Sequence, residues 1–222
     1  MRLLGDWSAE IPDFVPEDLD PVYQAEIARY DRIAQAGPEA YAGHAQTHPE
    51  WRAKMVKRWL DLARPFLEIG PGFGELLRIT EGERYAVDLS RAMLERLRDI
   101  PGVRLARALA DNLPFEDVPQ IVADSVFQTV PCRERFLCEV ARALAPGGRF
   151  IFSIAYRWNY PRRPQQGFDV RKEKGRRLLR RYLKELGLEP VVCWDYLSLS
   201  GRYWSDDIQD CDILYIGVKK GG

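Results

Sequence analysis

The chain has 222 residues with 33 basic and 33 acidic side chains, so its formal net charge is zero. This balance disfavours a general polyanion binder, and 46% hydrophobic with 11% aromatic residues disfavour a disordered chain. The length suits one domain with a substantial core. No apolar run is long enough to cross a membrane, and residues 1–10 lack an apolar stretch of secretory length. We therefore expect a cytoplasmic protein.

The cysteines give no sign of a metal centre or a disulfide framework. None of the four is spaced as Cys-x-x-Cys, and no pair of histidines lies near them. We therefore expect reduced thiols and no metal site. They are Cys132, Cys138, Cys193 and Cys211.

The N-terminal part predicts an arm followed by helices. Residues 1–20 contain prolines and several acids and indicate an irregular arm. Asp20 followed by Pro21 is typical of a helix start, and Gly37 with the proline after it ends that helix. We assign residues 1–64 to an arm and helical cap, and residues 65–222 to the core of a single domain.

A second N-terminal helix is expected over residues 51–64. Thr47 and Glu50 form a capping-box pattern just before it. Four of its residues recur at helical spacing and predict one buried face. They are Trp51, Met55, Trp59 and Ala63.

From residue 65 onward, strand and helix patterns alternate. Ser90 is the expected cap of one helix, and residues 133–145 form another amphipathic helix before the turn of Pro146, Gly147 and Gly148. Strands separated by single helices predict a doubly wound, mostly parallel sheet with helices on both faces. The strand candidates are residues 65–70, 85–89, 103–110, 119–127 and 149–156.

The C-terminal part departs from this alternation. A helix over residues 170–187 is followed by two strand-like runs, 190–200 and 211–220, with no helix between them. Two strands joined by a short loop pair antiparallel. The predicted fold is therefore a Rossmann-like, seven-stranded, mostly parallel sheet that ends in an antiparallel hairpin.

The glycine-rich turn LEIGPGFG, residues 67–74, is the main functional motif. A phosphate loop would need a Lys after the glycines, which is absent. A dinucleotide site would need Gly-x-Gly-x-x-Gly, whereas this chain has Gly70, Gly72 and Gly74 at alternate positions. A backbone that approaches a nucleoside carrying an amino acid is the third interpretation.

This turn resembles motif I of the class I S-adenosylmethionine-dependent methyltransferases of the small-molecule (type 11-like) subgroup. Asp88 lies where that family places its ribose-binding acid, and ADNLPF at 110–115 resembles its adenine-binding segment. ARALAPGGRFIFSI at 141–154 resembles the family's helix, turn and fifth strand, and the hairpin matches its sheet ending. The resemblance covers residues 60–155 well and the last forty in outline.

The resemblance implies S-adenosylmethionine as the cofactor, and the chemistry of the residues agrees. A carboxylate such as Asp88 can accept both hydroxyls of a vicinal diol, and glycines let backbone amides approach a carboxylate. Glu68 would orient the ammonium group, and Asp111 would accept the adenine amino group. Each residue also has a purely structural alternative, such as a steric role for the glycines. The implied cofactor-binding residues are Glu68, Gly70, Pro71, Gly72, Gly74, Asp88, Leu89, Asp111, Asn112, Leu113 and Gln128.

The acceptor side is less defined by the sequence. A sulfonium-bound methyl group is already activated, so alignment alone can drive its transfer and no base is assigned. Arg162 and Arg163 could pair with a carboxylate. The alternative for the whole segment 156–168 is a solvated loop. The N-terminal segment that holds Tyr30, Tyr41, His44 and His48 is expected to cover the site, and His44 is the histidine considered as a base. The predicted substrate-side residues are Tyr156, Trp158, Asn159, Tyr160 and His44.

Two further patterns allow other functions. Pro131-Cys132 resembles the nucleophile motif of cytosine-5 methyltransferases, but an amphipathic helix follows it at once. The basic helix 171–186 is compatible with RNA, although its leucines form a buried side and its charges an ordinary solvated face.

We therefore expect methyl transfer from S-adenosylmethionine to an O, N or C atom of a small molecule. An RNA or protein methyltransferase and a catalytically silent cofactor-binding module are the alternatives. We expect no nucleic-acid or membrane partner, and either a monomer or a homodimer.

Overall fold

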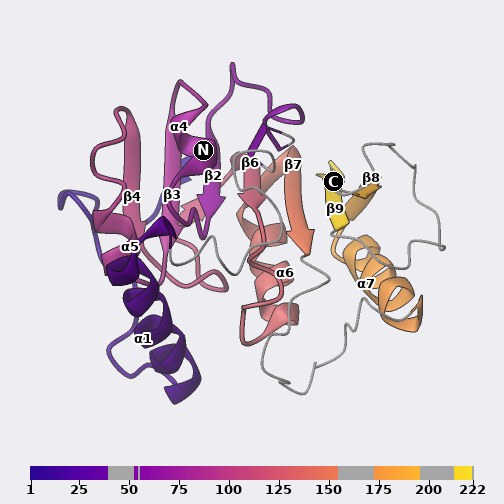
Figure 1. Cartoon of the computed structure of the whole chain (residues 1–222). Helices are drawn as coiled ribbons and strands as arrows, with labels where there is room; N and C mark the ends of the chain where they lie inside the picture. Colours follow the sequence, from indigo (N-terminus) through magenta and orange to yellow (C-terminus); the bar gives the residue numbers. More distant parts are fainter. Residues whose placement is uncertain (40–52, 55, 155–172, 196–212, 222) are drawn as a thin grey trace.

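The computed structural model describes residues 1–39, 53–54, 56–154, 173–195 and 213–221. A seven-stranded sheet in the order β4-β3-β2-β6-β7-β9-β8 forms its centre (Figure 1). The first five strands of that order are mutually parallel, and β9 runs antiparallel to both β7 and β8. The predicted fold class is therefore confirmed, including the terminal hairpin. The strands are β4 (Val103–Arg107), β3 (Arg84–Asp88), β2 (Phe66–Ile69), β6 (Val118–Ala123), β7 (Leu144–Ile154), β9 (Ile213–Lys219) and β8 (Leu188–Asp195).

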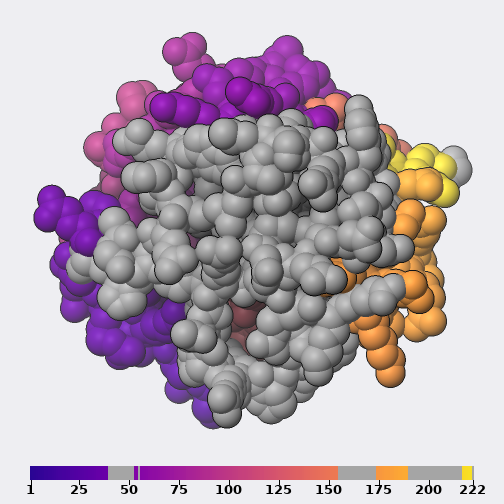
Figure 2. Space-filling view, turned by 45° about the vertical axis from the view of Figure 1, so that its right-hand side comes forward, coloured from indigo at the N-terminus to yellow at the C-terminus, as the bar shows by residue number. Residues whose placement is uncertain are grey.

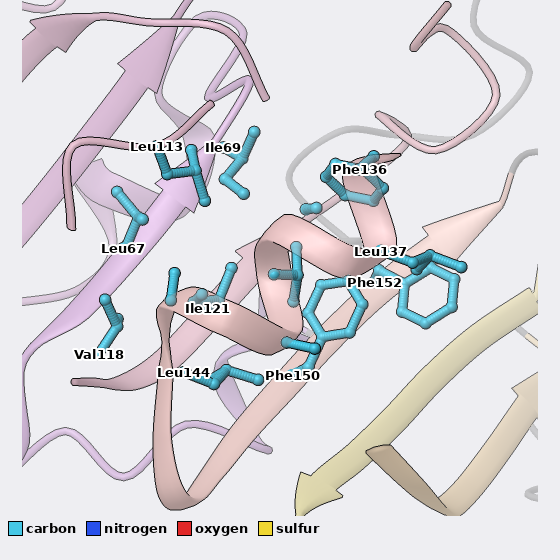
Figure 3. Close-up of a cluster of buried hydrophobic side chains, with 14 of the residues drawn as sticks. Leu67, Ile69, Leu113, Val118, Ile121, Phe136, Leu137, Leu144, Phe150 and Phe152 are labelled. Atoms are coloured by element: carbon cyan, nitrogen blue, oxygen red, sulfur yellow. The ribbon is translucent and has the colours of Figure 1, made fainter. Parts of the chain in front are cut away.

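Each face of the sheet has its own hydrophobic core. Along the strands, successive side chains point to opposite faces, so alternate residues join different clusters. One face packs against α6 (Arg133–Ala143) and α7 (Glu173–Glu185). Figure 3 shows this cluster, in which Phe136 of α6 lies near Phe150 of β7, and Phe150 stacks on Phe152.

The opposite face packs against α4 (Glu75–Arg78), α5 (Arg91–Glu95) and the segment 53–60. The strand residues of this second cluster include Phe66, Ala86, Leu105, Val122 and Ile151. The predicted Ser90 cap of α5 is confirmed, because its Oγ accepts a hydrogen bond from the Met93 amide at 3.1 Å.

The N-terminal arm is more ordered than predicted. β1 (Arg2–Leu3) pairs antiparallel with β5 (Phe115–Glu116). Farther along, the Phe14 amide donates to the Arg107 carbonyl, and the Arg107 amide donates to the Pro12 carbonyl. The expectation of an irregular arm was therefore wrong in part, because the unpaired groups of the edge strand β4 give the arm hydrogen-bonding partners.

Helix α1 (Pro21–Ala36) begins and ends where the sequence predicted. The Asp20 carboxylate accepts from the Val22 amide at 2.8 Å, and Gly37 ends the helix with φ of 84°. α1 lies against α5, whereas α7 lies at the other side of the molecule in both views (Figures 1 and 2).

The helix predicted over residues 51–64 is shorter than expected. Residues 53, 54, 56 and 57 are helical, a turn follows at 58–59, and Ala63 is exposed. The predicted buried face is therefore wrong at Ala63, and Trp51 and Met55 lie outside the described residues. The reason is tertiary: the buried Gln120 side chain accepts from the Asp61 amide at 2.7 Å and donates to the Asp61 carbonyl at 2.9 Å.

The strand before the hairpin also begins earlier than expected. α6 ends at Ala143 and β7 starts at Leu144, so the Pro146–Gly148 turn lies inside the strand. The pairing of β7 with β6 accommodates it through a shift in register between Val118 and Gln120.

Candidate functional site

Four adjacent strands carry a polar side chain near their carboxyl ends on one face of the sheet. In the order β3, β2, β6 and β7, these residues are Asp88, Glu68, Asp124 and Ser153. Each lies two positions after a hydrophobic residue of the second cluster, and side chains two apart share a face. The hydrophobic partners are Ala86, Phe66, Val122 and Ile151.

A cavity lies over these strand ends, where open parallel sheets bind their ligands. It is walled by the β2–α4 turn, the loops after β3, β4 and β6, and one face of α1. Seven of the predicted cofactor residues line it. They are Glu68, Gly70, Pro71, Gly72, Asp88, Leu89 and Asp111.

The glycine turn leaves open space above its backbone. Gly72 has φ of 58°, which favours glycine, and a Cβ added there would meet nothing closer than 3.7 Å. At Gly70 a Cβ would instead lie 2.6 Å from Cγ2 of Val126. The turn therefore combines close packing against the β6 loop with an exposed backbone that faces the cavity.

Gly74 serves the packing of the turn and does not line the cavity. A Cβ at this position would lie 2.8 Å from Ile100 and 2.9 Å from Leu97. The helix that follows, α4, is only four residues long.

Asp88 is a buried carboxylate with spare hydrogen-bonding capacity. Only 8% of its surface is exposed, and its Oδ1 accepts from the Ser90 amide at 2.8 Å. Burial raises the pKa of Asp88 to about 7, with a smaller contribution from the neighbouring Asp31. The site therefore favours a ligand that donates hydrogen bonds to this group.

Glu68 is buried more completely and one of its oxygens lacks a partner. Its exposed fraction is 4%, and Oε2 accepts no hydrogen bond from the described residues. Burial, with the charges of Asp124 and Glu75, raises the pKa of Glu68 well above its usual value. An unpaired buried acceptor at a cavity wall is expected where a ligand supplies the missing donor.

Asp111 is held from two sides and keeps one oxygen free. Its Oδ2 accepts from the Tyr23 hydroxyl of α1 and from Nη2 of Arg135 at 2.7 Å. Its Oδ1 is buried and has no partner among the described residues. Burial and the Asp111 hydrogen bond raise the pKa of Tyr23, so the hydroxyl remains a donor. The free Oδ1 is available to a ligand amino group.

Two predicted residues next to Asp111 have their amides engaged inside the protein. The Asn112 amide donates to the Leu109 carbonyl at 3.1 Å, and the Leu113 amide donates to Oε1 of Glu139 at 2.6 Å. Neither residue lines the cavity. The structure therefore directs Asp111, and not the amides that follow it, toward the cavity.

Gln128 and Cys132 also lie away from the cavity lining. Oε1 of Gln128 is buried without a partner in the described part of the chain. Cys132 is the residue before α6, and its Sγ lies 4.0 Å from Oε2 of Glu134. The thiol is thus not among the groups that line the cavity, although Pro131 before it does line it.

The predicted substrate-side residues lie outside the described residues. These are Tyr156, Trp158, Asn159, Tyr160 and His44, with Arg162 and Arg163.

Sequence reasoning expected the N-terminal segment that holds Tyr30 to cover the site, but it missed two contributors to the cavity, the face of α1 around Tyr30 and one acid. α1 supplies Tyr23, Glu26, Tyr30 and Ile33, which recur at helical spacing and form one face. That spacing was a usable signal. The other is Asp124, whose position two residues after a buried strand residue matches that of Asp88 and Glu68.

The described residues contain no group of three or more metal-ligating side chains suited to a metal ion. Within the same ranges, no helix has the length and apolar character needed to cross a membrane.

Comparison with known proteins agrees with this geometry. The family model described as "Methyltransferase domain" matches residues 67–152, which include the glycine turn, Asp88, Asp111 and Asp124. Residues 67–152 are therefore similar to a methyltransferase domain. A relative in Mycobacterium ulcerans (strain Agy99), phthiotriol/phenolphthiotriol dimycocerosates methyltransferase 1, is 34% identical over 90 residues. That match covers 38% of this chain and 33% of the relative, so the chain matches about a third of the relative's length.

Solved methyltransferases share the fold over most of the chain. A TehB-like S-adenosylmethionine-dependent methyltransferase from Corynebacterium glutamicum is 16% identical, with 89% of this chain and 98% of that chain covered and a TM-score of 0.60. Geranyl diphosphate C-methyltransferase from Streptomyces coelicolor A3(2) is 18% identical, with 92% and 100% covered and a TM-score of 0.61. At these identities the likeness shows the fold of the methyltransferase domain.

Proposed function

We propose that the protein transfers the methyl group of S-adenosylmethionine to a small-molecule acceptor. The observation that carries this proposal is one cavity lined by two buried carboxylates, Asp88 and Asp111, and by the glycine turn. A ligand with a diol, an amino-substituted base and an amino acid end has donors and acceptors for all three.

The residues present fit this cofactor. Asp88 would accept the ribose hydroxyls, because its buried carboxylate lines the cavity and retains acceptor capacity beside its backbone donors, Ser90 and Leu89. The free Oδ1 of Asp111 would accept the adenine amino group. The open backbone at Gly72 would face the methionine carboxylate, and Glu68 would hold the ammonium group.

The bound cofactor supplies a methyl group that its sulfonium already activates. The protein contributes position and exclusion of water, which are sufficient for a large part of the acceleration. α1 contributes by closing one side of the cavity: Tyr23 is bound to Asp111, and the Ser90 hydroxyl donates to Asp31 at 2.5 Å. These two contacts attach α1 to the loops that would hold adenine and ribose.

A small-molecule acceptor is supported by the shape of the site and by relatives. The cavity is walled on several sides, including by α1. The solved neighbour from Streptomyces coelicolor is named for geranyl diphosphate, and the mycobacterial relative for phthiotriol and phenolphthiotriol dimycocerosates. No described residue of the basic helix α7 lines the cavity, which weakens the RNA alternative.

Calorimetry with S-adenosylmethionine and S-adenosylhomocysteine, followed by turnover on a metabolite panel and on bulk RNA, tests this function. We expect binding of both cofactor forms and turnover on metabolites. Binding without turnover on any acceptor would support the silent-module alternative. Turnover on RNA alone would support the alternative of an RNA methyltransferase.

A further inference from the structure

Asp124 lies at the carboxyl end of β6 and is held in place by the next strand. The Ser153 hydroxyl of β7, whose residue is 1% exposed, donates to Oδ1 of Asp124. The same oxygen of Ser153 accepts from the Ser125 amide at 2.8 Å. Two hydrogen bonds therefore fix the Asp124 carboxylate and the residue after it to β7.

The backbone at this point turns sharply. Ser125 has φ of 59°, a left-handed conformation that is uncommon for a residue with a side chain. Such conformations persist where surrounding contacts hold them, and here the Ser153 contact does so. The turn leaves Asp124, Ser125 and Val126 on the cavity wall.

The order of the strands places Asp124 on the acceptor side. Asp111 follows β4, Asp88 ends β3, and the glycine turn follows β2. A cofactor held by these groups runs across the sheet from β4 toward β2, with its adenosyl end first. The next strand in that direction is β6, so the side chain beyond the methionine end is Asp124.

The charged side chains on the described part of the cavity wall are all acidic. Glu68, which is nine-tenths buried with an unpaired Oε2, is the group proposed above to hold the ammonium end of the cofactor. Asp124 is only partly buried and can be reached by a second molecule. Acidic walls attract a cation and repel a carboxylate or diphosphate. The acids are Glu26, Glu68, Glu75, Asp88, Asp111 and Asp124.

We propose that Asp124 binds the acceptor, positioned by Ser153, and that the acceptor is an amine. This inference rests on the proposed methyltransferase function and names its substrate class. An amine that enters as its ammonium form gives one proton to the Asp124 carboxylate. The neutral nitrogen then uses its lone pair to form the N–C bond with the methyl carbon while the S–C bond breaks.

The balance of this step needs no further reactant. The electrons of the broken S–C bond remain on sulfur, which becomes the neutral thioether of S-adenosylhomocysteine. The nitrogen becomes a methylated ammonium, and the proton on Asp124 passes to water after release. Ser153 acts through Asp124 and is a positioning residue.

Compounds that share a skeleton and differ only in head group test the inference. We choose three triplets of amine, alcohol and acid, two of them aromatic because Tyr23, Tyr30 and Phe73 line the cavity. Turnover is measured as S-adenosylhomocysteine formed, and affinity by NMR titration of the protein saturated with S-adenosylhomocysteine. The triplets are 2-phenylethylamine, 2-phenylethanol and phenylacetic acid; tryptamine, tryptophol and indole-3-acetic acid; and hexylamine, hexanol and hexanoic acid.

In the wild-type protein we expect at least one amine to bind about tenfold more tightly than its matched alcohol and acid. Asp124→Asn should lower kcat on that amine about 100-fold, within the range for loss of a proton acceptor. It should also reduce the tenfold preference in affinity to less than about threefold. The calorimetric Kd for S-adenosylhomocysteine should change less than about threefold. Asp18→Asn is the matched control, because Asp18 is exposed and remote from the cavity lining.

Ser153 variants separate positioning from mere packing. Ser153→Ala should lower kcat about tenfold with an unchanged melting temperature, and Ser153→Thr, which keeps the hydroxyl, should restore activity to within about threefold. A Thr variant as weak as the Ala variant would contradict the positioning role.

The outcomes distinguish a failure of this inference from a failure of the proposed methyltransferase function on which it rests. Failure to bind S-adenosylmethionine would contradict the proposed function itself. Cofactor binding with turnover only on alcohols or acids would contradict the inference alone. So would the absence of any amine preference, or an amine preference that Asp124→Asn leaves intact.

Discussion

Strand β3 has a buried charged side chain at each end, and the two side chains differ in their hydrogen-bonding partners. Arg84 begins the strand and is 6% exposed, and Asp88 ends it and is 8% exposed. The Arg84 guanidinium donates to the carbonyls of Leu77, Thr80, Gly82 and Pro101. Asp88, by contrast, has a raised pKa and accepts hydrogen bonds from the backbone amides of Ser90 and Leu89.

The difference distinguishes a structural polar cluster around Arg84 from a ligand-binding polar cluster at the carboxyl ends of the strands. Each nitrogen of Arg84 has a partner within the protein, and these partners close the turns at the amino ends of the strands. At the carboxyl ends, Glu68 and Asp111 each retain an unpaired buried oxygen. Buried polar groups are normally paired, so their exceptions mark where a ligand completes the network. The contrast can be tested by disturbing each end in turn.

The largest effect should come from removing the carboxylate of Asp88. Asp88→Ala is expected to weaken cofactor binding by 100-fold or more, about 3 kcal/mol, because the ribose hydroxyls lose their acceptor. The melting temperature should not fall, since a buried carboxylate is itself unfavourable to the fold. Calorimetry and thermal denaturation measure the two quantities. A Kd close to that of the Asp18→Asn control would contradict the ribose assignment.

The opposite end of the strand should show the reverse pattern. Arg84→Met leaves buried carbonyls unpaired and is expected to lower the free energy of unfolding by about 3 kcal/mol. That corresponds to a melting temperature roughly 10 °C lower for a chain of this size. The folded fraction should bind the cofactor within about threefold of wild type. Arg91→Met, at an exposed ion pair with Glu95, is the control and should change stability little.

Much of the cofactor side of the site was predictable from the sequence, because its residues belong to local sequence patterns. The glycine turn, Asp88 and Asp111 follow strands whose apolar residues are continuous. Their order along the chain, together with the rule for parallel sheets, predicts their convergence. The Asp20 and Ser90 caps were likewise readable, since a cap and its helix lie within a few residues.

What could not be predicted depends on contacts between distant segments. The bond of Tyr23 to Asp111 joins residues 88 positions apart, and the Gln120 contact that shortens the helix near Asp61 spans 59 positions. The contact of Ser153 with Asp124 requires the register of β6 and β7. No local pattern carries that information, which is why Asp124 was seen only as part of a strand.

A smaller effect should appear when pH is varied without any mutation. The pKa of Asp88 is raised in the folded state to about 7 from 3.8. The protonated carboxyl therefore stabilises the unliganded fold fully below about pH 4, and this stabilisation is lost as pH rises through about 7. Ribose hydroxyls require the ionised form as acceptor. Cofactor affinity should therefore rise about tenfold from pH 6 to pH 8, and binding near pH 6 should release a proton.

Calorimetry in two buffers of different ionisation enthalpy measures that proton release. Asp88→Asn, which keeps the shape of the side chain but cannot ionise, is the control. Its affinity should be weaker and nearly independent of pH over this range. A pH dependence equal to that of the wild-type protein would assign the titration to another group.

The smallest effect should follow from loosening the adenine side of the cavity. Tyr23→Phe removes the α1 hydroxyl that donates to Oδ2 of Asp111, while Arg135 still holds the same oxygen. Because one of two donors remains, we expect cofactor affinity to fall only about fivefold, close to the 1 kcal/mol typical of one hydrogen bond. Tyr182→Phe, which removes a hydroxyl on α7 next to Cys138, is the matched control and should leave Kd unchanged. If Tyr23→Phe changes stability but not affinity, α1 fastens to the fold at Asp111 without contributing to the cofactor site. A loss of cofactor affinity at constant stability would instead show that α1 contributes to cofactor binding through Asp111. The polar cluster around Arg84, by contrast, contributes to stability alone.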